Sequence, residues 1–313
     1  MRLMALLAQI FAVSTSVSAS AEPLKELNIS LSKSPFVLQL LVMRDKQLLQ
    51  REFKDDGIKI HWHIFNSSPK AASAMAAGNL DIAGSMNTAS VLMLNSEGLP
   101  VRIMTGTARP SSNFAIVAKP HSHLSIKDLR GRQIVGPKGT FLHQLLAVAL
   151  EKEGMNEEDV QFINLSISRT LNSILSGNAD AALLAGSALV KANKAGAQTI
   201  ITAEGLVEPT LVMTTTQKFA DEFPDIVRRV NKVYEEALLW VKNNPDEAAE
   251  MGAKEHGVSF EEAKTLMKRS RYFDKMTKKD VEDLRENQKF LRSKGMMRTE
   301  VQVDSLILPI AME

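Results

Sequence analysis

Four stretches of the sequence place hydroxyl-bearing or small residues where a predicted strand is followed by a predicted helix. They are Ser32-Lys33-Ser34-Pro35-Phe36, Gly84-Ser85-Met86-Asn87-Thr88, Lys138-Gly139-Thr140-Phe141 and Gly186-Ser187. A helix N-terminus presents unpaired N–H groups and a partial positive charge, and hydroxyls add further donors, so this arrangement suits an anion. Phe36, Met86 and Phe141 stand beside these donors, where they can hold an apolar body. At any single junction, the alternative is a Ser or Thr that only caps its own helix.

Histidine supplies the remaining candidate chemistry. His61 and His63 alternate on one face of a predicted strand, and His121 and His123 repeat that spacing. A tetrahedral metal site needs three or four protein ligands, and neither pair has an evident third, so we predict no metal. His143 lies on the first turn of a predicted helix, beside a candidate binding junction. A half-exposed helical histidine is the alternative interpretation of that residue.

An enzyme would need an acid, a base or a nucleophile positioned in the cleft. His143 with Glu208 is the one pair that we can name, and no spacing supports it. The chain has no G-x-S-x-G elbow, no Walker loop and no G-x-G-x-x-G fingerprint. The residues alone therefore give little support for an enzyme and none for a cofactor, and on the resemblance described below we predict neither.

The elements that position these residues follow a repeated order. Gly78-Asn79-Leu80-Asp81-Ile82-Ala83 is echoed 99 positions later by Gly177-Asn178-Ala179-Asp180-Ala181-Ala182. In each copy a helix ends at Gly-Asn, and a short strand, a second helix, a Gly and a β-branched strand follow. Gly suits the left-handed conformation that often ends a helix. Repetition of the whole order predicts two similar α/β units.

Hydrophobic patterning extends this order along the chain. It predicts strands at residues 26–32 and 58–65 and a helix over 35–52 in the first unit, and a strand at 133–136 and a helix at 140–153 in the second. Such alternation is typical of a parallel sheet with helices on both faces. The C-terminal third is predicted to be helical, with segments at 217–222, 224–242, 246–256, 259–267 and 278–294. We expect the apolar tail, 306–312, to dock on the first unit.

Two segments, 107–114 and 206–214, are predicted to cross between the units and to form a hinge around a cleft. We predict lobe one from residues 22–112 and 214–313, and lobe two from residues 113–213. Thr107 lies at the first crossing. Arg109 and Glu208 flank the two crossings, where they can meet the charge of a ligand. Pairing with the hinge backbone is the alternative for both.

Composition limits the function classes. With 313 residues the chain has room for two domains, and its 24% charged and 44% apolar residues are ordinary for a globular protein. A formal net charge of +2 gives no general basic field for nucleic acid. Cysteine is absent, which excludes disulfides, thiol catalysis, Cys-ligated zinc and a lipidated cysteine.

The first 21 residues have the pattern of a secretory signal. Arg2 supplies a positive start, residues 3–13 form a short apolar core, and Ala19-Ser20-Ala21 offers a cleavage site. A membrane anchor is the alternative, but about 20 apolar residues are needed to span a bilayer and this run is shorter. We predict signal peptide 1–21 and an exported protein that is free in the periplasm or secreted, without a lipid anchor; the periplasm is favoured by the family resemblance described below.

Several runs together are similar to one family. Residues 129–140 read LRGRQIVGPKGT and residues 145–154 read LLAVALEKEG. Residues 71–90 match the pattern ALxxGxxDIAxxxxxP, residues 177–184 match GxxDAALL, and KFADEFPD at 218–225 precedes a long helix and Asn244-Pro245. In these runs, over about residues 27–295, the chain resembles the periplasmic substrate-binding proteins of importers for nitrate, taurine and aliphatic sulfonates.

The resemblance implies an α/β, two-lobe Venus-flytrap fold of the type II periplasmic-binding-protein class, without catalysis. It also implies a transmembrane permease of an ABC importer as partner, and binding loops at residues 34–36, 85–88 and 139–141. We expect a monomer that binds a small organic anion and no nucleic acid. The rivals are an exported enzyme of the same fold and the effector-sensing domain of a regulator, which should carry a helix-turn-helix and no signal peptide.

Two departures from the family pattern bear on the ligand. Ala185-Gly186-Ser187 stands where sulfonate binders often carry Trp-Asp-Pro or Glu-Pro, so this wall is smaller and less polar. Ser112-Asn113-Phe114 stands where taurine-type members tend to carry Asn-Ser-Glu, which weakens the case for an amine-bearing ligand. We therefore predict an alkyl or aryl sulfonate or an aromatic carboxylate, favoured over nitrate or taurine. A pyrimidine-type or other non-sulfonate ligand is the alternative.

Overall fold

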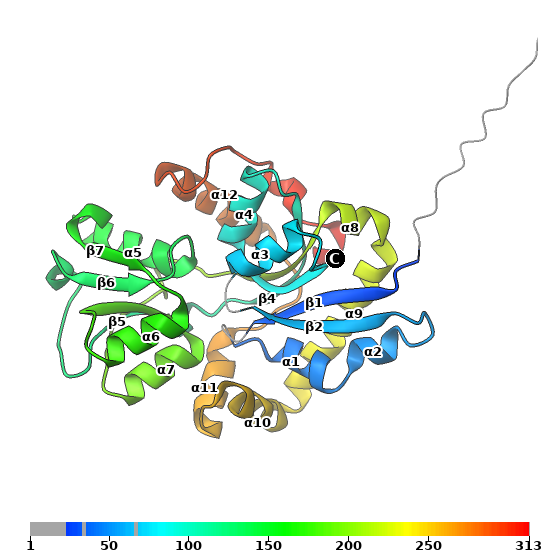
Figure 1. Cartoon of the computed structure of the whole chain (residues 1–313), viewed down its shortest axis with the longest axis horizontal. Helices are drawn as coiled ribbons and strands as arrows, with labels where there is room; N and C mark the ends of the chain where they lie inside the picture. Colours follow the sequence, from blue (N-terminus) through cyan, green and yellow to red (C-terminus); the bar gives the residue numbers. More distant parts are fainter. Residues whose placement is uncertain (1–22, 33–35, 66–67, 313) are drawn as a thin grey trace, which may run out of the picture.

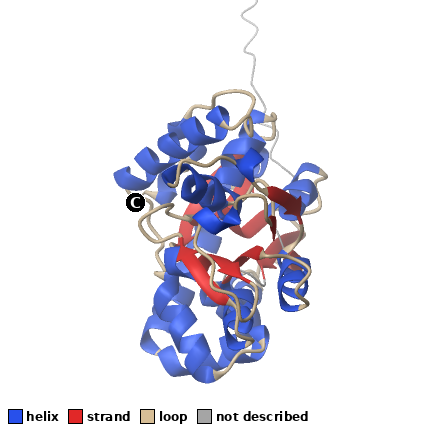
Figure 2. Cartoon of the chain, turned by 90° about the vertical axis from the view of Figure 1, so that its left-hand side faces the viewer, coloured by secondary structure: helices blue, strands red, loops and turns tan. Residues whose placement is uncertain are grey.

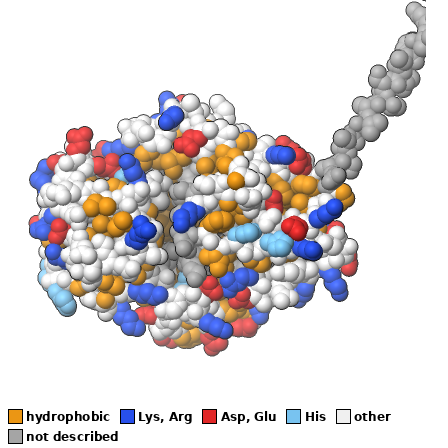
Figure 3. All heavy atoms as spheres, in the orientation of Figure 1, with side chains coloured by type: hydrophobic (Ala, Val, Ile, Leu, Met, Phe, Trp, Pro, Cys, Tyr) orange, Lys and Arg blue, Asp and Glu red, His pale blue; other side chains and the backbone are white. Residues whose placement is uncertain are grey.

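The computed structural model describes residues 23–32, 36–65 and 68–312. The predicted signal peptide, 1–21, and the candidate site residues Ser34 and Pro35 lie outside these residues. Two lobes, each built on a five-stranded sheet, lie side by side with helices around both sheets (Figures 1 and 2). Basic and acidic side chains are interspersed over the described part of the face in Figure 3, as expected for a chain with a small net charge.

The sheet of lobe one has the strand order β2-β1-β3-β10-β4. Its strands are β1 (Glu26–Ser32), β2 (Lys59–Phe65), β3 (Ile82–Asn87), β4 (Val101–Ala108) and β10 (Leu211–Thr216). β1 is parallel to β2 and β3, whereas β10 runs antiparallel to both of its neighbours. The sheet is therefore mixed, although alternating strands and helices are typical of a parallel sheet, because the chain returns from lobe two and inserts β10 in the opposite direction.

Lobe two repeats this plan with the order β7-β6-β8-β5-β9. Its strands are β5 (Phe114–Ala118), β6 (Gln133–Gly136), β7 (Gln161–Asn164), β8 (Ala181–Ala185) and β9 (Gln198–Thr202). Here β5, the strand that enters from lobe one, is antiparallel to β8 and β9. Each lobe thus contains one antiparallel crossing strand. β10 begins at Leu211, which our predicted boundary assigns to lobe two.

The helices follow the predicted order. Lobe one carries α1 (Leu38–Asp45), α2 (Leu48–Glu52), α3 (Ser68–Ala76), α4 (Thr88–Ser96), α8 (Gln217–Glu222), α9 (Pro224–Asn243), α10 (Pro245–His256), α11 (Phe260–Ser270) and α12 (Lys278–Ser293). Lobe two carries α5 (Phe141–Lys152), α6 (Ile167–Leu175) and α7 (Gly186–Lys194). The single helix predicted over 35–52 is wrong: α1 and α2 are separated at Gln47, whose φ of 53° is left-handed and incompatible with a continuous helix.

Helix ends are set by local side chains. Asn87, Thr216, Ser259 and Thr277 cap α4, α8, α11 and α12 through their side-chain oxygens. These oxygens satisfy backbone N–H groups that have no partner in the first turn. The boundaries of the C-terminal helices were predictable because these caps are readable in the sequence.

The cores lie on both faces of each sheet. One apolar cluster covers the α1 and α9 face of lobe one, and another covers the α6 and α7 face of lobe two. A third cluster joins the α3, α4 and α12 face of lobe one to the α5 face of lobe two, and it includes Met86 and Phe141. The two lobes therefore share apolar packing on the side of α4 and α5.

The C-terminal tail docks on lobe one, as predicted. The backbone N–H of Leu308 donates to the carbonyl of Ile103 at 3.0 Å, and the N–H of Met276 donates to the carbonyl of Ala311 at 2.7 Å. None of the helices among the described residues combines the length and the apolar composition that crossing a membrane requires.

Candidate functional site

A cavity of about 360 Å³ lies between the two lobes, beyond the carboxyl ends of the sheet strands. This is where ligands sit in open α/β sheets. Lobe one contributes Ser32, Ser68, Lys70, Ser85, Asn87 and Leu211. Lobe two contributes Phe114, Pro137, Lys138, Thr140, Phe141, Leu142, Asn164, Leu165, Ser166, Ile167 and Ala185.

The lobe-one wall is polar. Ser85, on β3, is 9% exposed, and its Oγ has no hydrogen-bond partner among the described residues. Asn87, two residues further on, is already engaged: its Oδ1 accepts from the N–H of Ser90 at 2.8 Å, and its Nδ2 donates to Ser68 Oγ at 3.1 Å. Ser85 is therefore the hydroxyl on this wall that is poised to receive or donate a hydrogen bond to a ligand.

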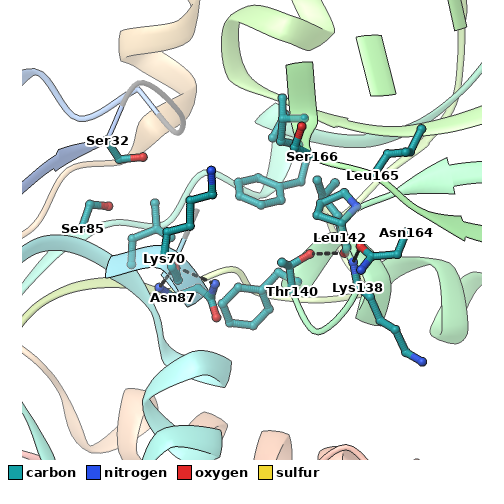
Figure 4. Close-up of a pocket in the computed structure, with 17 residues that line it drawn as sticks. Ser32, Lys70, Ser85, Asn87, Lys138, Thr140, Leu142, Asn164, Leu165 and Ser166 are labelled. Atoms are coloured by element: carbon teal, nitrogen blue, oxygen red, sulfur yellow. Dashed lines mark hydrogen bonds between the residues drawn. The ribbon is translucent and has the colours of Figure 1, made fainter. Parts of the chain in front are cut away.

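Lys70 brings a positive charge to the same wall. It lies on the first turn of α3, and its side chain extends into the space between the lobes, with the hydroxyls of Ser32 and Ser85 on one side (Figure 4). It makes no ion pair with any described residue. None of the described residues that line the cavity is acidic, so this charge is left for a ligand.

The lobe-two wall differs in that two of its polar side chains, Thr140 and Asn164, are bonded to the backbone. Thr140 Oγ1 donates to the carbonyl of Pro137 at 2.9 Å, and Asn164 Oδ1 accepts from the N–H of Lys138 at 3.0 Å. The Lys138 side chain points away from the cavity (Figure 4). What faces the cavity on this side is mainly apolar.

Of the candidate residues from the sequence, Ser85, Asn87, Thr140 and Phe141 lie on this cavity. Two of the apolar candidates do not. Phe36 is 1% exposed and packs against His256, with ring centroids 4.7 Å apart, and Met86 is fully buried. Met86, on β3, and Phe36, which lies just before α1, each belong to one of the apolar clusters of the core.

The remaining junction residues lie near the cavity without lining it. Thr88 lines a smaller neighbouring cavity of about 230 Å³ beside α12, and Ser187 lines a groove between α6, α7 and the end of α10. Gly139 and Gly186 have φ values of 68° and 57°, which glycine adopts without strain. Their role in the structure is to let the chain turn into α5 and α7.

The candidate residues of the hinge pair within the protein. Arg109 makes a two-pronged ion pair with Asp280, with Nη2 2.6 Å from Oδ2 and Nε 3.0 Å from Oδ1. Glu208 accepts from the Ser111 hydroxyl at 2.9 Å and lies 3.3 Å from Arg271. The Thr107 carbonyl accepts from Gln39 Nε2 at 3.3 Å. These contacts fix the crossing segments to α12, to the end of α11 and to the core of lobe one. The side chains of Arg109 and Glu208 therefore pair with other side chains, and not with the hinge backbone.

His143 is built into lobe two. It is 3% exposed and stacks on Phe162, with ring centroids 4.8 Å apart. Its Nδ1 accepts from the N–H of Gly139 at 3.4 Å, and its Nε2 lies 2.7 Å from Glu157 Oε1. The His143 ring lowers the pKa of Glu157, with smaller contributions from Lys294 and Lys138. His143 thus pairs with Glu157, not with Glu208.

The histidines on β2 also have local partners. His63 Nε2 lies 2.9 Å from Asn28 Oδ1, and His61 Nε2 lies 3.6 Å from Glu26. Within the described residues there is no group of three or more His, Cys, Asp or Glu side chains arranged to hold a metal ion.

A family model described as NMT1/THI5 like matches residues 53–248. The chain belongs to the NMT1/THI5-like family. A Bacillus subtilis (strain 168) protein, named as an aliphatic sulfonates-binding protein, is 26% identical over 238 residues, which are 75% of this chain and 70% of that protein. This agrees with the resemblance seen in the sequence.

Solved structures show the fold of this NMT1/THI5-like protein. The alkanesulfonate-binding protein SsuA from Xanthomonas axonopodis pv. citri, bound to MOPS, matches with a TM-score of 0.81 at 19% identity, over 90% of this chain and 98% of that one. The desulfurization enzyme DSZB matches with a TM-score of 0.69 at 16% identity, over 91% and 96%. The predicted two-lobe periplasmic-binding-protein fold is confirmed, and the same fold also serves an enzyme.

Lys70 is the cavity residue that sequence reasoning missed most clearly. Our search examined the ends of strands, whereas Lys70 follows Ser68-Pro69 inside the first turn of a helix. Pro at the start of a helix marks that turn, so the signal was present. An isolated lysine at such a position is otherwise typical of a solvated surface.

Proposed function

We propose that this protein is the extracytoplasmic solute-binding component of an ABC importer and binds a small organic anion between its lobes. The observation that carries the proposal is the cavity wall. Lys70 and the Ser85 hydroxyl, which has no partner among the described residues, face the space, and no described lining residue is acidic. The names of the Bacillus subtilis relative and of SsuA, which refer to sulfonate binding, support it.

Within this class we propose an alkyl or aryl sulfonate or an aromatic carboxylate, in preference to nitrate or taurine. The apolar side chains of Phe114, Leu142, Leu165, Ile167 and Ala185 would be left against water by an anion as small as nitrate. Taurine adds an ammonium group, for which the described lining offers no carboxylate. Burying such a charge without a partner is costly.

Closure of the two lobes follows from the same geometry. The cavity is lined from both lobes, which are joined by two crossing segments, so a ligand that touches both walls stabilises the closed arrangement. We propose lobe one at 22–112 with 211–313 and lobe two at 113–210, with the predicted boundary at 214 moved because β10 belongs to the lobe-one sheet. We also propose a signal peptide at 1–21 and a periplasmic monomer that delivers its ligand to a permease.

We propose binding without catalysis. DSZB shows that the fold can carry an enzyme, but the candidate acid–base pair of this chain is divided, with His143 on Glu157 and Glu208 on Ser111 and Arg271. The cavity wall, as far as it is described, therefore offers no such pair to a bound molecule. Unchanged ligand recovered after prolonged incubation with the protein is the expected result.

Thermal unfolding of the mature protein against a ligand panel tests the proposal. The panel contains nitrate, sulfate, taurine, MOPS, alkyl and aryl sulfonates, aromatic carboxylates and pyrimidines. A ligand at 100 times its Kd adds about 2.7 kcal/mol of stability, which raises the Tm of a protein of this size by about 5–10 °C. We expect the shift for sulfonates or aromatic carboxylates.

Two results would contradict the proposal. A shift for nitrate or taurine alone would overturn the preference for a bulky organic anion. Absence of any shift, with no small molecule released when the purified protein is denatured, would overturn the binding function itself.

A further inference from the structure

We propose that the two lobes divide the ligand between them: lobe one holds its charged head through Lys70 and Ser85, and lobe two holds an apolar body with no second polar end. This inference rests on the proposed function, because it takes for granted that an organic anion occupies the cavity. It adds which residue recognises the charge and which part of the ligand must remain unsubstituted.

The polar side chains of lobe one fall into those that bond to each other and those that have no partner among the described residues. Ser68 and Asn87 bond to each other, and Asn87 also caps α4. Ser85 keeps a buried oxygen without a described partner, and Lys70 has no ion pair with any described residue. Both point into the cavity from the same side (Figure 4). Together they offer a charge and a hydroxyl to one anionic group.

Two polar side chains of lobe two are already hydrogen-bonded within the protein. The Thr140 hydroxyl and the Asn164 amide oxygen are bonded to the backbone of 137 and 138. The Lys138 side chain points away from the cavity (Figure 4), and its charge helps to lower the pKa of Glu157, after the larger effect of His143. This leaves an aliphatic and aromatic surface, with the exposed Ser166 hydroxyl at its margin.

These two walls favour an amphiphilic monoanion. Each additional buried methylene contributes about 0.8 kcal/mol, so affinity should rise about fourfold for each carbon added until the lobe-two wall is covered. A polar group at the far end of the ligand would be buried against side chains that cannot bond to it, which weakens binding. Unsubstituted alkane-1-sulfonates or arenesulfonates fit this description, and ω-amino sulfonates do not.

Calorimetric titration of four variants against a short ligand series tests the division. The ligands are propane-, butane- and pentane-1-sulfonate, benzenesulfonate and 3-aminopropane-1-sulfonate, which matches butane-1-sulfonate in size. We expect Lys70→Gln to weaken binding about 10- to 100-fold, as loss of a hydrogen bond to a charged group does. Ser85→Ala should weaken it about 2- to 10-fold. Lys138→Gln removes a lysine from the same cavity and serves as the matched control, and Ser166→Ala removes the remaining lobe-two hydroxyl; neither should change Kd by more than about twofold.

Lys70→Arg keeps the charge and separates recognition from folding. It should bind within about tenfold of the wild type, and the thermal unfolding of both Lys70 variants without ligand should be unchanged because Lys70 is exposed. In the wild type, 3-aminopropane-1-sulfonate should bind at least about tenfold more weakly than butane-1-sulfonate.

The outcomes distinguish this inference from the function on which it rests. If no sulfonate and no aromatic carboxylate binds the wild type, the proposed function fails. If sulfonates bind but Lys70→Gln and Lys138→Gln have equal effects, or Ser166→Ala has the larger effect, then lobe one does not hold the charge. Equal affinity for the amino and the alkyl sulfonate would overturn the apolar assignment of lobe two.

Discussion

The two copies of the Gly-Asn-x-Asp motif have the same backbone and different chemistry. Gly78 and Gly177 are both left-handed, with φ of 72° and 76°. The N–H of Asp81 donates to the carbonyl of Asn28 at 3.0 Å, and the N–H of Asp180 donates to that of Gln133 at the same distance. In both lobes the motif therefore ends a helix and starts the strand that leads to the cavity.

The side chains around the two copies have diverged. Beyond the first copy, Ser85 and Asn87 form a polar wall, and Asn87 also caps α4. Beyond the second, Ala185 is apolar, and Gly186 opens α7 without a side-chain cap. A duplicated scaffold thus supplies two equivalent walls, and a few residues after each strand decide whether a wall binds charge or apolar surface.

Gly84 offers the strongest way to break the first copy. A Cβ at this position would overlap the Ser30 carbonyl oxygen and lie 2.9 Å from Leu40 Cδ1. Because the carbonyl belongs to a central strand, it cannot move aside, and overpacking of this kind costs about 3 kcal/mol or more. We expect Gly84→Ala to lower the free energy of unfolding by that amount in a urea titration.

Gly78→Ala is the matched control. No atom lies within 4 Å of a Cβ built at Gly78, so the substitution costs only the left-handed conformation, about 1–2 kcal/mol. If the two variants lost the same free energy of unfolding, the overlap of the added Cβ with Ser30 and Leu40 would not account for the loss in Gly84→Ala.

Most of this scaffold was readable in the sequence. The C-terminal helices have Pro, Ser or Thr at their starts, and α8 occupies the predicted residues 217–222. Pairing between strands was not readable. The segment 206–214 was predicted to cross back between the units, but nothing in that run says that β10 will insert between β3 and β4 in the opposite direction. The break at Gln47 also has no local signal, since its side chain favours helix.

The cavity was predicted less completely than the fold. The rule that ligands bind beyond strand ends located Ser85, Asn87, Thr140 and Phe141 on the wall. It cannot tell which of several neighbouring side chains faces the cavity, so Met86 was included although it faces the core. Nor does it reach Lys70, which belongs to a helix and is brought to the cavity by tertiary packing.

The cap of α4 is a second difference between the two copies, with a smaller expected effect. Asn87 Oδ1 accepts from the N–H of Ser90 in a buried site, and loss of such a cap costs about 1–2 kcal/mol. We expect Asn87→Ala to lower stability by this amount. The helix after the second copy, α7, has Ala185 at its N-cap and no side-chain bond there. The control is Ser166, which occupies the N-cap of another lobe-two helix, α6, without a side-chain bond, so Ser166→Ala should change the free energy of unfolding by less than about 0.5 kcal/mol. If Asn87→Ala lost no more stability than Ser166→Ala, the Asn87 cap would not stabilise α4.

Replacing the two aspartates of the motif should change the free energy of unfolding least, and the change with pH should have opposite signs in the two copies. Burial raises the pKa of Asp81 above its ordinary 3.8, although Asn28 donates to its carboxylate. Burial by itself would also raise the pKa of Asp180, but hydrogen bonds from Lys119 and from the Gln133 N–H outweigh burial and lower the pKa. Asp180 therefore stabilises the fold above about pH 4, and this contribution is lost as pH falls below that value. Asp81 behaves in the opposite way, because ionising it above its raised pKa costs stability.

Urea titrations of Asp81→Asn and Asp180→Asn from pH 3 to pH 7 test this contrast. Asp180→Asn should lose at most about 1 kcal/mol at pH 7, as expected for a partly exposed ion pair, and less near pH 3. The stability of Asp81→Asn relative to the wild type should increase as pH rises through the same range, because the amide can still accept from the Asn28 N–H and carries no charge. If both variants followed the same slope with pH, the two copies would share one electrostatic environment, and the divergence that we infer would be confined to the residues at the cavity.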